Sequence, residues 1–285
     1  MYVAVLIGFI YIDEPITGVV VDLYRAYKFC QLTNTMCFVL TDMVDHPPEV
    51  NRAIIDRTVD DGIKSFTGKL APDQEPLPNL KFYNVRNLQE IMGVIDHIDL
   101  TQEPRVMFYY SGHGEIDGMI RMPTGEKHDF IQFRDMLLSR CWDEAEILML
   151  IDCCNSGDWG LPYRLDTRSK CFRLKNLNHL TLPVVILISA SSGDEKAIAS
   201  HQNSLFTRHL FDVLSTKKPS LSILVNKIQA LLKQSTNIIA GADDLHQTVG
   251  VYSSYPIQPL MWSWVMLDGP CVTSSTVTSS LIISP

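Results

Sequence analysis

The feature that most constrains the fold is a repeated alternation between continuous apolar runs and segments with helical periodicity. The apolar runs are short, rich in β-branched residues and span residues 2–10, 37–41, 106–110, 146–151 and 183–189, with a last short run at 248–252. Runs of this length without polar alternation are typical of strands covered on both faces. The sequence therefore predicts a buried and mostly parallel sheet.

Amphipathic segments separate these runs. Apolar residues recur at helical spacing within 16–30, 88–98 and 220–233, and residues 130–141 and 204–214 are also expected to be helical. Strands that alternate with helices imply an α/β fold, here a three-layer sandwich with helices on both faces of the sheet. In such folds, functional side chains lie in loops beyond the carboxyl ends of the strands.

Composition narrows the functional classes. The chain has 285 residues and a net charge of −8, which argues against a nucleic-acid or anionic-membrane partner. No apolar stretch is long enough to span a bilayer, and the apolar N-terminus lacks the basic residues of a signal peptide. Seven irregularly spaced cysteines do not predict a disulfide framework, so we expect a reducing, cytoplasmic setting.

Two strand ends carry residues suited to catalysis. The run at 106–110 is followed by Ser-Gly-His-Gly, which contains His113, and the run at 146–151 by Asp-Cys-Cys-Asn-Ser-Gly, which contains Cys154. A thiol at one strand end and an imidazole at another form the pair that a cysteine nucleophile needs. The backbone N–H groups near Gly114 and Cys154 are candidates for an oxyanion hole.

Simpler interpretations of the same residues exist. A histidine in a glycine-rich turn is often structural, and a cysteine that ends an apolar strand is often a small buried hydrophobe. A zinc site is a third use of Cys and His, but the chain has no second Cys/His pair at the spacing of metal ligands. The occurrence of both motifs at predicted strand ends favours the catalytic interpretation.

The two motifs resemble those of caspase-like cysteine peptidases, and most closely those of the metacaspase and orthocaspase branch. The metacaspase counterpart of the second motif usually reads D-[SC]-C-H-S-G. Further support comes from Val5-Leu6-Ile7-Gly8, Leu205-Phe206-Thr207-Arg208 and Gln247-Thr248, and the similarity spans residues 2–268. The resemblance implies a caspase-type sheet, with Cys154 as nucleophile and His113 as its acid/base partner. Cys153 would then pack in the core, and Asn155 departs from the histidine common at its position.

The resemblance also implies a preference for Arg or Lys before the cleaved bond. The acidic positions of the metacaspase specificity pocket correspond to Asp22 and Asp152, and Ser111 is the third matching position. Paired carboxylates would bind a guanidinium through charge-assisted hydrogen bonds. Alternatively, Asp22 is an exposed helix acid and Asp152 a strand-end cap, and cleavage after Asp is the fallback specificity.

Many metacaspases need calcium. Their calcium ligands are acidic residues after the histidine loop and an Asp after the cysteine. Here the loop after His113 offers only Glu115, Asp117, Glu126 and Asp129, and the expected Asp after the cysteine is missing. Calcium needs six to eight oxygen ligands, so we expect no metal site and no cofactor.

The resemblance divides the chain into a peptidase domain at 1–268 and a tail at 269–285 that we expect to be disordered. Within the domain, 1–157 is similar to a large subunit, 158–182 to the linker loop and 183–268 to a small subunit. The linker is rich in basic residues, so an enzyme that cuts after Arg or Lys could process itself there. Residues 45–78 are rich in Pro, Asp and Gly and are expected to be irregular.

Two other functions remain open. A legumain-like peptidase shares related motifs but would prefer Asn and is usually secreted. A caspase-fold interaction or decoy module in cell-death or immune signalling would use the fold without catalysis. The expected partners of the enzyme are protein or peptide substrates, and the expected state is a monomer or homodimer.

Overall fold

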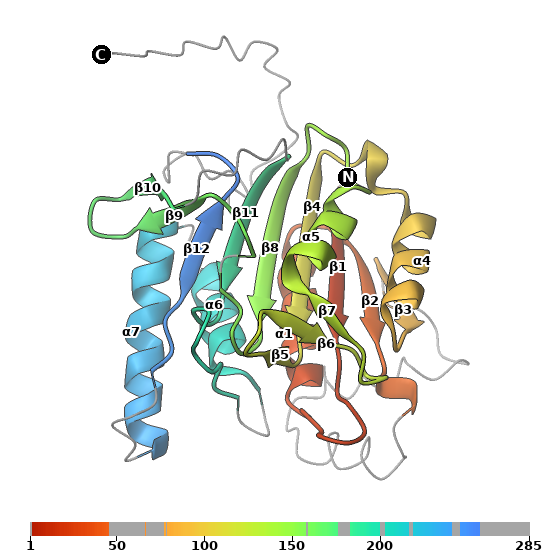
Figure 1. The fold of residues 1–285 in the computed structure, drawn as a ribbon, viewed down its shortest axis with the longest axis horizontal. Helices are drawn as coiled ribbons and strands as arrows, with labels where there is room; N and C mark the ends of the chain where they lie inside the picture. Colours follow the sequence, from red (N-terminus) through yellow and green to blue (C-terminus); the bar gives the residue numbers. More distant parts are fainter. Residues whose placement is uncertain are drawn as a thin grey trace.

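The computed structural model describes residues 2–45, 66, 77, 79–157, 159–175, 183–199, 203–216, 219–240 and 246–256. Its centre is a twisted nine-stranded sheet that runs through the whole domain (Figure 1). The order of the strands is β10-β9-β12-β11-β8-β4-β1-β2-β3. The strands are β1 (Val3–Gly8), β2 (Met36–Thr41), β3 (Leu80–Asn84), β4 (Arg105–Ser111), β8 (Glu146–Asp152), β9 (Tyr163–Asp166), β10 (Cys171–Leu174), β11 (Val184–Ser189) and β12 (Gly250–Ser253).

Six neighbouring strands of this sheet, β3, β2, β1, β4, β8 and β11, run parallel to one another. The remaining strands, β12, β9 and β10, pair antiparallel. Parallel strands bury both faces, which explains why β1, β4 and β8 are continuous apolar runs in the sequence. Their carboxyl ends therefore meet at one edge of the sheet.

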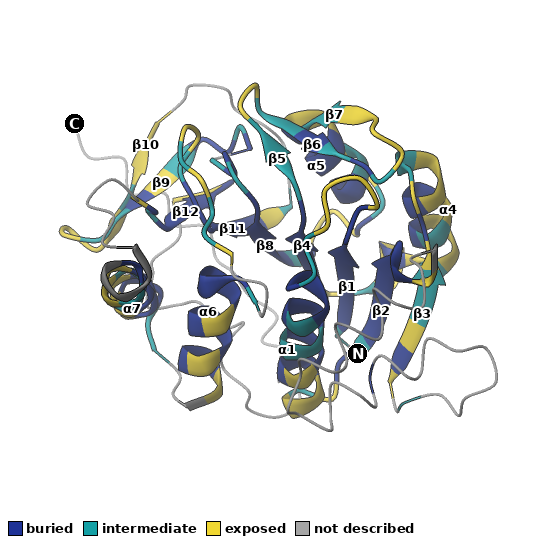
Figure 2. Cartoon of the chain, turned by 90° about the horizontal axis from the view of Figure 1, so that it is seen from below, coloured by how far each residue is buried: buried dark blue, intermediate teal, exposed yellow. Residues whose placement is uncertain are grey.

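Helices cover both faces of this sheet (Figure 2). On one face, α1 (Val19–Leu32), α6 (Leu205–Thr216) and α7 (Leu221–Ala240) pack into one apolar cluster with the strands. On the other face, α4 (Leu88–Ile98) and α5 (Phe130–Leu138) pack into a second cluster. The described residues also include two short 3₁₀ turns, Met43–Asp45 and Leu100–Gln102. The predicted three-layer α/β sandwich is confirmed.

A second, three-stranded sheet lies beside the first, in the order β5-β6-β7 (Figure 1). Its strands are β5 (Gly114–Glu115), β6 (Met119–Arg121) and β7 (Lys127–Asp129). These strands could not be predicted from the sequence because each has only two or three residues. They begin directly after His113 and end at Asp129, whose carboxylate accepts hydrogen bonds from Ile131 N and Gln132 N at the start of α5.

The segment expected as a linker loop differs from its prediction. Residues 163–174 form an antiparallel hairpin of β9 and β10, and β9 pairs with β12, so the hairpin extends the main sheet. In the sequence, the alternation of apolar and polar residues in these two strands is short and interrupted by charged residues. The hairpin was therefore not predicted. Within the linker, residues 158 and 176–182 lie outside the described residues, as do most of 45–78 and the tail at 269–285. None of the helices in the described part of the chain combines the length and apolar composition needed to span a bilayer.

The packing of α7 gives a test of this core. Leu224 is fully buried, whereas the neighbouring Ile223 is 48% exposed. We expect Leu224→Ala to lower the free energy of unfolding by about 2–5 kcal/mol, because it removes buried methyl groups and leaves a cavity. Ile223→Ala is the matched control and should change it by less than about 0.5 kcal/mol. Urea unfolding measures both, and equal effects would contradict the assigned helix face.

Candidate active site

The site begins with the register of two neighbouring strands. In the pairing of β4 with β8, Ser111 lies opposite Asp152. His113 follows the first residue by two positions and Cys154 follows the second by two, so both lie just past the same edge of the sheet. The sheet therefore brings the two predicted strand ends together, although 41 residues separate them in the chain.

Gly114 packs directly against the backbone of Cys154. A Cβ at Gly114 would lie 2.0 Å from the carbonyl oxygen of Cys154 and 2.9 Å from the sulfur of Cys153. Only glycine fits such a close approach of two backbones. Asn155, whose φ is +54°, donates from its side-chain amide to the carbonyl oxygen of Gly114 at 3.3 Å. The two residues predicted to supply oxyanion N–H groups are thus in contact.

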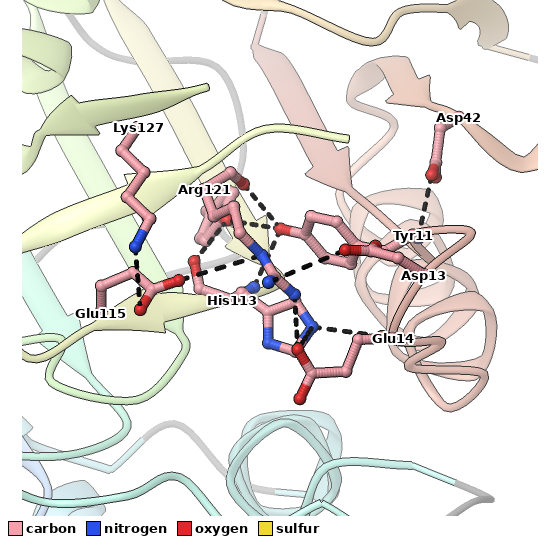
Figure 3. Close-up of polar contacts among 9 residues, drawn as sticks. Tyr11, Asp13, Glu14, Asp42, His113, Glu115, Arg121 and Lys127 are labelled. Carbon is pink, nitrogen blue, oxygen red and sulfur yellow. Dashed lines mark hydrogen bonds and ion pairs between the residues drawn. The ribbon is translucent and has the colours of Figure 1, made fainter. Parts of the chain in front are cut away.

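His113 has a defined orientation (Figure 3). Its Nε2 lies 3.2 Å from the backbone carbonyl oxygen of Glu14. A carbonyl oxygen can only accept, so the proton of the neutral ring is on Nε2 and the lone pair is on Nδ1. Burial lowers the pKa of His113, and the nearby Arg121 guanidinium lowers it further. The neutral ring is therefore favoured.

Cys154 is half-buried, and Cys153 is buried in the core, as the strand alternation predicts. The Cys154 sulfur lies 3.9 Å from the backbone carbonyl oxygen of Ala197. Burial raises the pKa of the Cys154 thiol. Among the described residues, no hydrogen bond joins this thiol to the His113 imidazole. The two pKa shifts favour a neutral thiol and a neutral imidazole.

Asp22 and Asp152 lie close enough for their charges to interact, and both are buried, with exposed fractions of 1% and 4%. Both oxygens of Asp22 accept from Ser204 N at 3.1 Å, and Asp152 accepts from the hydroxyl of Thr207. The interpretation of Asp22 as an exposed helix acid is therefore wrong, because Asp22 lies on the buried face of α1. Ser111 is also buried, between Gly8 of β1 and Asp152 of β8.

Burial changes the chemistry of this acid pair. It raises the pKa of Asp152 to about 6. It also raises the pKa of Asp22 well above its ordinary value, and the Asp152 charge adds to this shift. Two carboxylates that share a low-dielectric site disfavour full ionisation. A cation near both carboxylates would stabilise their charged forms.

The loop after β11 holds the nucleophile loop in place, a role that the sequence analysis missed. The hydroxyls of Ser156 and Ser191 contact each other at 3.1 Å, and each residue's backbone N–H donates to the other's hydroxyl. Asn155 N donates to the carbonyl oxygen of Glu195, whose carboxylate accepts from Thr248 N. Serines and a single glutamate in loops give no periodic signal by which sequence reasoning could have found them.

A cavity of about 600 Å³ lies beside the nucleophile loop. Asn155 and Gly157 line it, together with Arg164 and Lys175 near the ring of Tyr252. Neither Asp22 nor Asp152 lines it, so it is separate from the predicted pocket for the residue before the cleaved bond.

Three of the four acids considered as calcium ligands have partners within the protein. Glu115 lies within 4.0 Å of Arg121 and Lys127, Glu126 lies 3.6 Å from His128, and Asp129 caps α5. In the described part of the chain, no group of three or more His, Cys, Asp or Glu side chains could hold a metal ion.

Known proteins share this architecture. A family model described as the caspase domain matches residues 81–281. The crystal structure of caspase-1 from Spodoptera frugiperda aligns with a TM-score of 0.51 and 13% identity, over 88% of this chain and 85% of that chain. A structure of a protein from Geobacter sulfurreducens aligns with a TM-score of 0.54 and 13% identity, over 90% and 94%. At this identity the two structures show the fold alone, and no curated protein matches the chain.

The buried Asp152 predicts an unusual dependence of stability on pH. Its pKa is raised from 3.8 to about 6 in the folded protein, so the folded state binds the proton more tightly, and stability is lost as the pH rises through that window. Asn keeps an oxygen for the Thr207 hydroxyl but cannot ionise. We therefore expect the free energy of unfolding of Asp152→Asn to rise relative to that of the wild type as the pH increases from 4 to 6. Above pH 7 the difference should reach up to ~3 kcal/mol.

Urea unfolding at a series of pH values measures this gain. Asp143→Asn, at an exposed position, is the control and should follow the wild type. A loss of stability in Asp152→Asn at pH 8 would show that the charged carboxylate is well satisfied where it lies.

Proposed function

Because the chain belongs to the caspase-domain family, we propose that it is a cysteine endopeptidase in which Cys154 is the nucleophile and His113 the acid/base group. The observation that carries this proposal is the register of β4 with β8, together with the contact between Gly114 and Cys154. The residues that carry the thiol, the imidazole and the two backbone N–H groups all lie just past one edge of the sheet. Acyl transfer needs these three components.

The mechanism follows from the protonation states. The Nδ1 lone pair of His113 accepts the thiol proton as the Cys154 sulfur attacks the scissile carbonyl carbon. The backbone N–H groups of Gly114 and Cys154 stabilise the resulting oxyanion. The imidazolium then gives its proton to the leaving amine, which leaves a thioester. Water, deprotonated by the same ring, hydrolyses the thioester and restores the thiol.

The acid pair supports a preference for Arg or Lys before the cleaved bond. A guanidinium or ammonium near Asp22 and Asp152 would offset the cost of burying both charges, and its binding would lower both pKa values. Cleavage after Asp would instead require cations at this position. The proximity of the two carboxylates of Asp22 and Asp152 supports a basic residue instead. Such a specificity is the one expected of the metacaspase and orthocaspase branch, which we propose for this chain.

An interaction or decoy module is the second candidate. The observation that favours it is the absence of a hydrogen bond between the described side chains of His113 and Cys154. Catalytic hydrogen bonds are often long before substrate binds, so this geometry is compatible with catalysis.

Fluorogenic peptides that end in Arg, Lys, Asp or Asn distinguish these functions. We expect turnover after Arg and Lys that calcium does not enhance and chelator does not abolish. Cys154→Ala should abolish it. Asp152→Asn should raise KM for the Arg peptide more than for a peptide with an uncharged residue at the same position, because it removes one carboxylate from the pocket. Asp143→Asn, at an exposed position, is the control.

The possible results separate the candidates. Turnover after Asp alone would overturn the assignment of the acid pair, and turnover after Asn alone would favour a legumain-like enzyme. No turnover of any peptide by folded protein would favour the decoy module.

Self-processing is expected at the turn of the β9–β10 hairpin. Arg168 and Lys170 are exposed there, whereas Arg164 and Arg173 lie in paired strands. A protease needs an extended segment, and a turn can open without breaking the sheet. Mass spectrometry after incubation should find cleavage after residue 168 or 170 in the wild type and none in Cys154→Ala. Equal cleavage in both would exclude self-processing.

A further inference from the structure

The backbone is unusual where the chain leaves β1. Tyr11 has a φ of +63°, a conformation that residues with side chains rarely adopt. Tyr11 is nevertheless fully buried. Such a conformation persists only where the surroundings hold it in place, and it occurs often at functional sites.

Asp42 holds this turn. It directly follows β2 and is buried, and its two carboxylate oxygens accept from two consecutive backbone N–H groups: Ile10 N at 2.8 Å and Tyr11 N at 2.9 Å. Each N–H group thus has its own charged acceptor. Hydrogen bonds to a carboxylate are stronger than those between neutral groups, which explains how the chain keeps the left-handed conformation at Tyr11.

The turn places the Tyr11 side chain against the predicted catalytic histidine (Figure 3). The Tyr11 ring lies 4.4 Å from the His113 ring, measured between centroids. The Tyr11 hydroxyl accepts from His113 N at 2.9 Å and donates to the carbonyl oxygen of Arg121 at 2.8 Å. One hydroxyl therefore fixes the backbone on both sides of the β5–β6 hairpin that begins after His113.

The same turn also reaches the far side of the imidazole. Three residues after Tyr11, the carbonyl oxygen of Glu14 accepts from Nε2 of His113. The Glu14 carboxylate lies 2.8 Å from the Arg121 guanidinium, which in turn lies over the Tyr11 ring at 5.2 Å. The backbone, ring face and protonated nitrogen of His113 are thus all held from one turn.

We propose that Asp42 and Tyr11 are positioning residues for His113: Asp42 fixes the turn, and Tyr11 fixes the histidine so that Nε2 carries the proton and Nδ1 the lone pair. Neither residue touches the reacting atoms. This inference rests on the proposed role of His113 as the acid/base group. It adds a buried carboxylate on β2 and a tyrosine after β1 to a site otherwise built from β4 and β8.

Two substitutions test the proposal. Tyr11→Phe keeps the ring and removes the hydroxyl that joins His113 to Arg121. Asp42→Asn leaves one acceptor oxygen for two N–H groups, and its amide nitrogen would face a donor. The matched controls are Tyr27→Phe and Asp166→Asn. The Tyr27 hydroxyl accepts from Gln31 in α1, and the Asp166 carboxylate accepts from Arg168 N and Ser169 N in the β9–β10 turn.

The first measurement is ¹⁵N NMR of the imidazole of His113, assigned through the His113→Gln variant. In the wild type we expect the neutral ring to carry its proton on Nε2. In Tyr11→Phe and Asp42→Asn we expect a mixture of the two tautomers, while both controls keep the wild-type spectrum. The charged groups near this ring, Glu14, Glu115 and Arg121, remain unchanged in every variant.

The second measurement is hydrolysis of the Arg peptide. We expect kcat to fall about 10- to 100-fold in Tyr11→Phe and Asp42→Asn, with KM changed less than about threefold, because misplacing a catalytic group affects the chemical step. A rise of KM with kcat unchanged, or a wild-type tautomer in Tyr11→Phe, would overturn the proposal. If Asp42→Asn does not fold, Tyr11→Phe alone decides.

The two readouts separate this inference from the proposed function. If the wild type hydrolyses no peptide, the proposed function fails, and the tautomer in Tyr11→Phe still shows whether the turn positions the ring. If the wild type is active and Tyr11→Phe keeps both its kcat and its tautomer, the positioning role fails alone.

Discussion

The parallel pairing of β4 with β8 is the constraint on which the rest of this site depends. Because the side-chain period of a strand is two, one register decides which residues face each layer and which reach the edge. The pairing that sets Ser111 opposite Asp152 buries one apolar cluster on each face of the sheet. It also brings Gly114 against Cys154, where no side chain would fit. A slip of one residue would move each side chain of the strand to the opposite layer and separate the site.

Much of the fold could be read from the sequence because both layers obey simple periodicities. The runs that became β1, β4, β8 and β11 are buried on both faces, and the amphipathic segment that became α4 has the same bounds in the structure. The two motifs with His113 and Cys154 follow strands, so the sheet itself explains their proximity. The short strands β5–β7 and the hairpin β9–β10 could not be read, because their pairing depends on distant partners.

The surroundings of the site were harder to predict for the same reason. Asp22 gave the pattern of an ordinary helix acid, and only the packing of α1 against the sheet shows that it is buried beside Asp152. Tyr11 directly follows an apolar run, and nothing in that pattern indicated its left-handed backbone. Asp42 lies 31 residues from Tyr11 in the chain. Local patterns report periodicity, whereas these residues are defined by contacts across the sheet.

The buried polar groups also show where stability is given up. Asp22, Asp152 and Asp42 are all removed from water, yet their environments differ. Asp42 has two backbone N–H donors arranged for its two oxygens, as a structural carboxylate requires. Asp22 and Asp152 lie near each other. The charge of Asp152 raises the pKa of Asp22, and both charges raise the pKa of the nearby Tyr109. A pair of this kind is typical of sites where function, rather than folding, decides the residue.

The β9–β10 hairpin has a consequence for how this protein meets other chains. By pairing with β12 it leaves β10, a strand of four residues, as the outer one of the described strands on that side of the sheet. Arg173 in β10 and Lys170 and Lys175 beside it are exposed. Short edge strands that carry positive charge resist pairing with further strands. The hairpin thus gives this edge of a long, mostly apolar sheet a built-in protection against aggregation.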